Sequence, residues 1–129
     1  MNEKVFYQFD NSSGIFYKYH YGNISIEEIT SSWEFAFQQK LIPPKVKGFI
    51  LDYTEATFDF PIQDFRKISA FYRQHLDVFK EYRIAIITSN PKDMIIPILI
   101  AMEDVGYYSK EFSSLENARK WVLENEGLK

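Results

Sequence analysis

The chain has 129 residues, no cysteine and a formal net charge of −3 at pH 7. A chain of this length fits one domain, and without cysteine it has no disulfide, thiolate metal ligand or cysteine nucleophile, which is typical of a reducing cytosol. It has no basic block that would favour nucleic acid, no signal region at its start, and no apolar run near the roughly 20 residues of a membrane span. We therefore expect residues 1–129 to form a single domain of a cytoplasmic protein without stable membrane insertion.

Alternating residues predict two strands at the start of the chain. Apolar and polar residues alternate over residues 5–9 and more clearly over residues 15–21, where Lys18 and His20 occupy the polar, outward face of an edge strand. The turn formers of residues 10–14 lie between the two runs. This pattern predicts an antiparallel hairpin.

The first helix has clear start and stop signals. Ser25 and Glu28 have the spacing of a capping box, and Pro43 with Pro44 ends the helix. Between them the apolar side chains recur at helical spacing: Ile26, Ile29, Trp33, Phe37 and Leu41.

Two short, unbroken apolar runs predict central strands at about residues 46–53 and 83–88, because such runs are typical of strands covered on both faces. A helical stripe fills residues 62–79 between them. Asn90 and Pro91 then have the pattern of an N-cap and first-turn proline of a third helix.

Residues 107–112 alternate and predict a fifth strand at an edge of the sheet, and Ser113 with Glu116 forms a capping box for a last helix. The order ββαβαβαβα predicts an α/β fold. It has one mixed, mostly parallel five-stranded sheet, an N-terminal antiparallel hairpin and four helices.

This order resembles the anti-sigma-factor antagonist fold, the STAS or SpoIIAA-like domains, over most of the chain. The segments that carry the resemblance are residues 48–52 with 56–59 beyond them, the strand at 83–88, and the ending at 112–121 with its late tryptophan. The resemblance implies a non-enzymatic regulatory module that docks to a protein partner.

Family members of the antagonist type carry a phosphorylatable serine at the start of the helix after the third strand, usually within Asp-Ser-Ser-Gly. The matching stretch here is Asp59–Ile62, which keeps the aspartate but has no serine. The run Asp10–Gly14 looks similar but lies in the first hairpin, where we assign it to turn chemistry. The resemblance therefore does not imply the usual serine switch, and Thr57 is the nearby hydroxyl that remains for phosphorylation.

Polar residues follow both central strands, where ligands tend to bind in parallel sheets. The candidate ligand-binding residues are Asp52, Tyr53, Thr54, Ser89, Asn90 and Lys92. The helix that starts at Pro91 would direct free N–H groups to the same place, which suits an anion. In the alternative interpretation, Asp52 and Asn90 only hold loops and the hydroxyls face water.

Neither a metal site nor a catalytic site is predicted. Asp52, Glu55 and Asp59 offer carboxylates, but their spacing matches no calcium loop, so we expect a solvated acidic loop. His20 and His75 are the only histidines and belong to no metal-binding or triad pattern. We expect no cofactor and no enzymatic activity. An enzyme that uses Asp52 or Asp59 as a base is a weaker option than the two functions compared below.

The third helix is unusually apolar, with nine consecutive apolar residues at 94–102 and Pro97 among them. Pro97 predicts a kink. Either neighbouring helices cover both flanks, or part of the helix is exposed as an association surface. We favour an association surface at a two-fold axis, which would make the protein a homodimer. The residues expected to form this interface are Ile95, Ile98, Leu99 and Met102.

Two functions remain in contention. The preferred one is a non-enzymatic, STAS-like interaction or regulatory module that lacks the phosphorylatable serine. The alternative is a small carrier for an apolar or amphipathic ligand, because the aromatic residues, 18% of the chain, could line a pocket.

Overall fold

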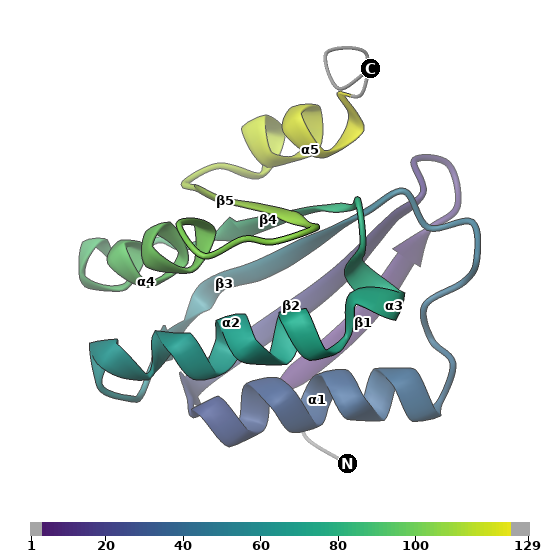
Figure 1. Ribbon diagram of the computed structural model, residues 1–129. Coiled ribbons are helices and arrows are strands. Elements are labelled where there is room, and N and C mark those ends of the chain that lie inside the picture. The colour runs from purple at the N-terminus through teal and green to yellow at the C-terminus, as the bar shows by residue number, and fades with distance from the viewer. Residues whose placement is uncertain (1–3, 125–129) are drawn as a thin grey trace.

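The computed structural model describes residues 4–124 (Figure 1). One sheet is formed by β1 (Val5–Asp10), β2 (Ile15–Ile24), β3 (Gly48–Phe58), β4 (Arg83–Ile87) and β5 (Tyr108–Phe112). The helices are α1 (Ile26–Gln38), α2 (Phe65–Gln74), α3 (Leu76–Phe79), α4 (Pro91–Ala101) and α5 (Leu115–Leu123), with a short 3-10 turn, η1 (Ile62–Asp64).

The strands lie in the sheet in chain order, β1-β2-β3-β4-β5. β1 and β2 form an antiparallel hairpin, and the other neighbouring strands pair in parallel. The predicted α/β fold, with its mixed five-stranded sheet and N-terminal hairpin, is therefore confirmed.

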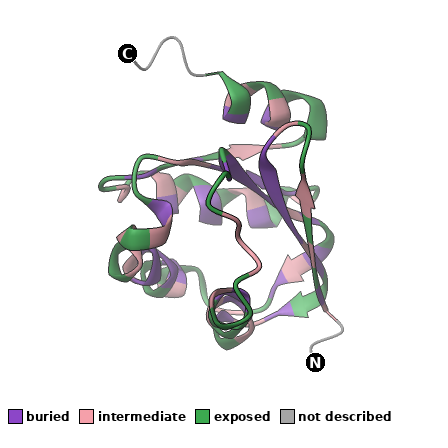
Figure 2. Cartoon of the chain, turned by 90° about the vertical axis from the view of Figure 1, so that its right-hand side faces the viewer, coloured by how far each residue is buried: buried purple, intermediate pink, exposed green. Residues whose placement is uncertain are grey.

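The two faces of the sheet are covered unequally (Figures 1 and 2). Side chains of α1, α2 and α4 pack on one face around Trp33, Phe49 and Tyr72, which form the larger core. α5 covers the other face with Ala118 and Val122, over the central strands. Central strands are therefore buried on both sides, as their unbroken apolar sequence predicts.

β3 is longer than predicted. It begins at Gly48 and continues past Asp52 to Phe58. β4 pairs with it only as far as Asp52, and beyond that point β3 is paired with β2 alone. The register shifts here: two steps along β2, from Tyr19 to Tyr21, match three along β3, from Asp52 to Glu55, so β3 carries a bulge.

The predicted helix at residues 62–79 is divided into η1, α2 and α3, which makes five α-helices instead of four in residues 4–124. The break lies at His75, whose φ of −122° and ψ of 40° are not helical. Its ring packs against Phe37 and Phe71, with centroids 5.0 and 4.4 Å away. Those contacts keep the divided helix on the core.

Two local predictions are wrong. Lys18 and His20 do not face solvent, because β2 is the second strand and this side of it lies under α1; the two side chains are 0% and 1% exposed. The last helix is capped by Ser114 and not Ser113, since the Ser114 hydroxyl accepts from Asn117 N. The capping box of Ser25 and Glu28 is confirmed.

Gly48 provides a test of how closely α5 packs on the sheet. A Cβ added there would collide with Val122 Cγ1 and lie 3.3 Å from the Arg83 carbonyl oxygen. We expect Gly48→Ala to destabilise the protein by about 1–3 kcal/mol in urea denaturation, because overpacking forces neighbours to move. Val122→Ala removes the colliding methyl, so the double variant should lose clearly less stability than the sum of both single losses. Simple additivity would contradict this contact.

Candidate functional site

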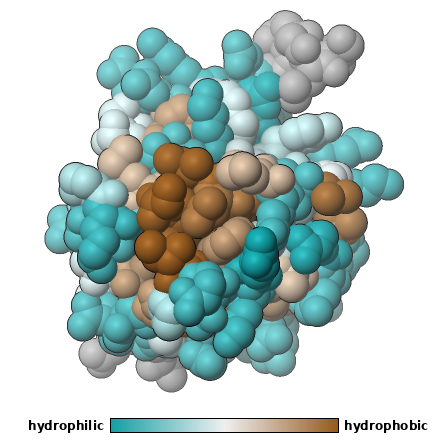
Figure 3. Space-filling model, turned by 60° about the vertical axis from the view of Figure 1, so that its left-hand side comes forward, coloured by the Kyte–Doolittle hydropathy of each residue, from teal (hydrophilic) through white to brown (hydrophobic). Residues whose placement is uncertain are grey.

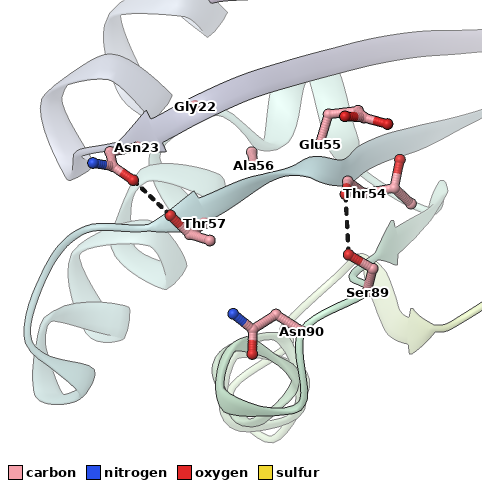
Figure 4. Close-up of a pocket in the computed structure, with 8 residues that line it drawn as sticks. All are labelled: Gly22, Asn23, Thr54, Glu55, Ala56, Thr57, Ser89 and Asn90. Carbon is pink, nitrogen blue, oxygen red and sulfur yellow. Dashed lines mark hydrogen bonds between the residues drawn. The ribbon is translucent and has the colours of Figure 1, made fainter.

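A shallow, open hollow lies at the carboxyl edge of β3 and β4 (Figure 4). Its volume is about 370 Å³, and polar and small residues line it: Gly22, Asn23, Thr54, Glu55, Ala56, Thr57, Ser89 and Asn90. The bulge and the extension of β3 form one wall, and the turn from β4 into α4 forms the other.

Most polar groups in the hollow already have partners within the protein. The Ser89 hydroxyl donates to the Thr54 carbonyl oxygen at 3.0 Å, and the Thr57 hydroxyl donates to Asn23 Oδ1 at 2.8 Å. Asn90 Oδ1 accepts from Lys92 N at 2.9 Å and caps α4, as predicted. The hollow thus presents mainly hydroxyl and amide groups that hold its two walls together.

Three of the six predicted ligand-binding residues line the hollow, namely Thr54, Ser89 and Asn90. Asp52 does not: its Oδ1 accepts from Thr54 N at 2.8 Å and from the Thr54 hydroxyl at 2.7 Å, which stabilises the bulge. Tyr53 points into the core, where its ring stacks on His20. Lys92 lies outside the lining and is 3.7 Å from Asp93 Oδ1.

Asp93 connects α4 to the sheet, which the sequence did not indicate. The carboxylate is buried, and its Oδ2 accepts from Phe58 N at 3.2 Å. This bond places the start of α4 against the end of β3, while the negative charge in the first turn suits the helix dipole. No set of three or more His, Cys, Asp or Glu side chains within residues 4–124 could hold a metal ion.

A buried polar cluster lies between β2 and α1. Lys18 Nζ donates to Ser32 Oγ at 2.6 Å, is 2.8 Å from His20 Nε2, and lies 4.9 Å from the centre of the Trp33 ring. The Ser32 hydroxyl in turn donates to the Ile29 carbonyl oxygen. Among the residues that the structure describes, no carboxylate forms an ion pair with this lysine.

Burial determines the protonation of this cluster. It lowers the pKa of Lys18 well below 10.5. It also lowers the pKa of His20 well below 6.5, with the nearby Lys18 adding to the effect. Both shifts follow because an apolar surrounding disfavours the charged form. Neither side chain reaches solvent, so the cluster contributes hydrogen bonds between β2 and α1 and has no access to a substrate.

The predicted interface residues lie on α4 and just after it. Ile95, Ile98 and Met102 are 39%, 44% and 78% exposed, whereas Leu99 is half-buried against the larger core. Figure 3, in which the side that carries α4 comes forward, shows an apolar patch bordered by hydrophilic residues. Through residues 4–124, no helix is both long enough and apolar enough to cross a bilayer.

Comparison with known proteins agrees with this architecture. No protein-family model matches the chain, and no curated protein matches it significantly. Among solved structures, an uncharacterised protein of the DUF3478 family from Shewanella loihica PV-4, which has a SpoIIAA-like fold, matches with a TM-score of 0.61 and 14% identity. The match covers 92% of this chain and 91% of that chain.

This chain has a SpoIIAA-like fold. The predicted resemblance is confirmed at the level of fold, which is as far as a likeness at 14% identity extends.

The buried lysine gives a pH test. Above pH 10.5 both folded and unfolded chains hold a neutral amine; below it the unfolded chain binds a proton first, so stability falls as the pH falls. We expect the stability of Lys18→Met relative to the unsubstituted protein to rise by up to about 1.4 kcal/mol per pH unit from pH 10 to 7. Urea denaturation at several pH values measures this.

Lys80→Met, which removes an exposed lysine, is the matched control. A stability difference between Lys18→Met and the unsubstituted protein that stays constant over this pH range would show that Lys18 is charged in the folded protein.

Proposed function

We propose that the chain is a non-enzymatic, STAS-like interaction module that docks to a protein partner and works as a homodimer, which forms through the outer side of α4. The supporting observation is the apolar surface formed by four residues, which we call the α4 patch: Ile95, Ile98, Met102 and Val105. These side chains are 39–78% exposed.

The two sides of α4 explain why this surface is not needed for folding. Ile96, Pro97 and Ile100 are buried against the sheet and α2, so the helix already has a complete inward side. One apolar side is enough to pack a helix on a sheet, so the outer side of α4 could be polar without loss of this packing. Apolar side chains there favour a surface that is covered in the working protein.

A second copy of the chain fits the α4 patch because both charge signs stand at its border. Arg66 and Glu103 form an ion pair of 3.1 Å beside the end of α4, and the exposed Lys92 lies at its start. In a two-fold arrangement each copy presents the same surface, so a border of one sign would repel itself. A mixed border permits the contact.

The segment before α2 supports a module without the usual serine switch. It is residues 59–62, which hold no hydroxyl side chain. The Phe60 ring packs against Phe58 at 5.5 Å, and Pro61 directly precedes η1. An apolar side chain and a proline therefore occupy the place where the resemblance implies a phosphorylated residue.

The alternative, a carrier for an apolar ligand, gains no support from the space under β3 and β4. That space is lined by apolar side chains, including Leu51, Ile68 and Ile100, but its volume is about 10 Å³. This is room for about one water molecule and not for an alkyl chain.

Ile98→Asp tests the dimer. Each buried isoleucine contributes roughly 1.5–3 kcal/mol, and the variant would place two carboxylates near the two-fold axis. We expect the dissociation constant of the dimer to rise at least about tenfold. Analytical ultracentrifugation should then find a monomer where the unsubstituted protein is a dimer. Circular dichroism should show an unchanged fold.

Leu115→Asp is the matched control, because Leu115 is 45% exposed and lies at the start of α5 on the other side of the sheet. The dimer should survive this change. A folded Ile98→Asp variant with the same mass as the unsubstituted protein would refute the role of the α4 patch.

A further inference from the structure

Part of the sheet face that carries α5 is left uncovered. α5 packs against β3, β4 and β5, and the outer parts of β1 and β2 extend beyond it. The side chains here are three aromatic rings and two carboxylates, which we call the ring face: Phe6, Tyr19, Tyr21, Asp52 and Glu55. Phe6 and Tyr21 are exposed, and Tyr19 is half-buried at the border of the smaller core.

The strand register brings these five residues together. Phe6 is the cross-strand partner of Tyr19, and Tyr19 is in turn the partner of Asp52. Tyr21 is paired with Glu55 just beyond the bulge. Directly paired residues share one face of a sheet. In agreement, Figure 4 shows the Glu55 side chain pointing away from Asn90 and the start of α4.

The rings are held in place before any partner binds. Phe6 and Tyr21 meet edge to face with centroids 5.5 Å apart, and Tyr19 stacks on Tyr17 at 5.8 Å. The Tyr19 hydroxyl also donates to Gln8 Oε1 at 3.4 Å. Phe6 is nevertheless 53% exposed and Tyr21 39% exposed. Ordered rings lose little side-chain entropy when a ligand stacks on them.

The two carboxylates of the ring face have no cationic partner among the residues that the structure describes. Within residues 4–124, no lysine, arginine or histidine nitrogen lies within 4.0 Å of the Asp52 or Glu55 carboxylate oxygens. In the described part of the chain, the Asp52 carboxylate accepts hydrogen bonds from Thr54 alone. Two uncompensated negative charges beside three rings complement a positively charged group that also stacks on aromatic faces.

The chain itself places an arginine beside a tyrosine and a carboxylate one position further along the same row of tyrosines. Arg119 of α5 donates from Nη1 to the Tyr17 hydroxyl, and the same nitrogen lies 4.0 Å from Asp10 Oδ2. A guanidinium thus already lies between a tyrosine hydroxyl and a carboxylate where α5 covers the row. Tyr19 and Tyr21 also stand beside carboxylates, those of Asp52 and Glu55, and within residues 4–124 no helix covers this part of the row.

We propose that the ring face binds an arginine side chain from a segment of a partner protein. Arginine fits better than lysine, because a planar guanidinium stacks on tyrosine while its N–H groups reach a carboxylate in a fork. This surface lies on the other side of the sheet from the α4 patch. Its occupation therefore does not depend on the proposed dimer.

The test uses three short labelled peptides that carry two arginines, two lysines or two glutamates in an otherwise identical Gly-Ser sequence. Fluorescence anisotropy measures their binding to the whole chain. We expect the arginine peptide to bind more tightly than the lysine peptide, and the glutamate peptide not to bind. The double variant Asp52→Asn, Glu55→Gln should bind the arginine peptide about three- to tenfold more weakly, since each exposed ion pair contributes little binding energy.

The matched control is Glu34→Gln, Asp77→Asn, which removes two exposed carboxylates elsewhere and changes the net charge equally. It should leave binding unchanged, as should Ile98→Asp, whereas Tyr21→Ala should weaken binding. Equal weakening by both double variants would show unspecific charge attraction and overturn the proposal. Equal affinity for the lysine peptide, or no binding of the arginine peptide, would overturn it too.

Discussion

Four helices, α1 to α4, cover one face of the sheet and α5 covers the other, and most other features follow from this unequal covering. The face under α1, α2 and α4 is closed, so whatever β2 presents to it must be buried, including the Lys18 amine. The face under α5 is closed only over the central strands. The outer hairpin therefore keeps aromatic rings at the surface, and no element within residues 4–124 covers the outer side of α4.

The length of β3 is the second feature that places the candidate surfaces. Because β3 continues past the last residue paired with β4, its end is held by β2 on one side and by Asp93 of α4 on the other. The gap that β4 leaves is the polar hollow. Tyr53 faces the core by the regular alternation that also buries Leu51, and the bulge that follows places Glu55 beside Tyr21. One irregularity in the strand thus shapes both sides of this edge.

The order of elements could be predicted from the sequence because it rests on local signals. The capping box at Ser25, the N-cap at Asn90 and the unbroken runs of the central strands depend only on near neighbours in the chain. The burial of Lys18 could not be predicted from the sequence, because polar and apolar residues alternate in β2 in the same way whether or not a helix covers that face. The partner that makes this burial tolerable, Ser32, lies on α1, and nothing in β2 identifies it.

The candidate site shows the same division. That polar residues follow the central strands is visible in the sequence, but which of them line the hollow depends on the bulge, since it separates Asp52 and Tyr53 from Thr54. The exposed residues of α4 could be found because a helix needs only one apolar side. The ring face could not be found in this way, because its residues come from three strands and are brought together by register alone.

The α4 patch and the ring face lie on opposite sides of the sheet, so a SpoIIAA-like module with both could bind a second copy and an arginine-bearing segment at the same time. The rigid sheet between them would then fix their relative positions without any conformational change.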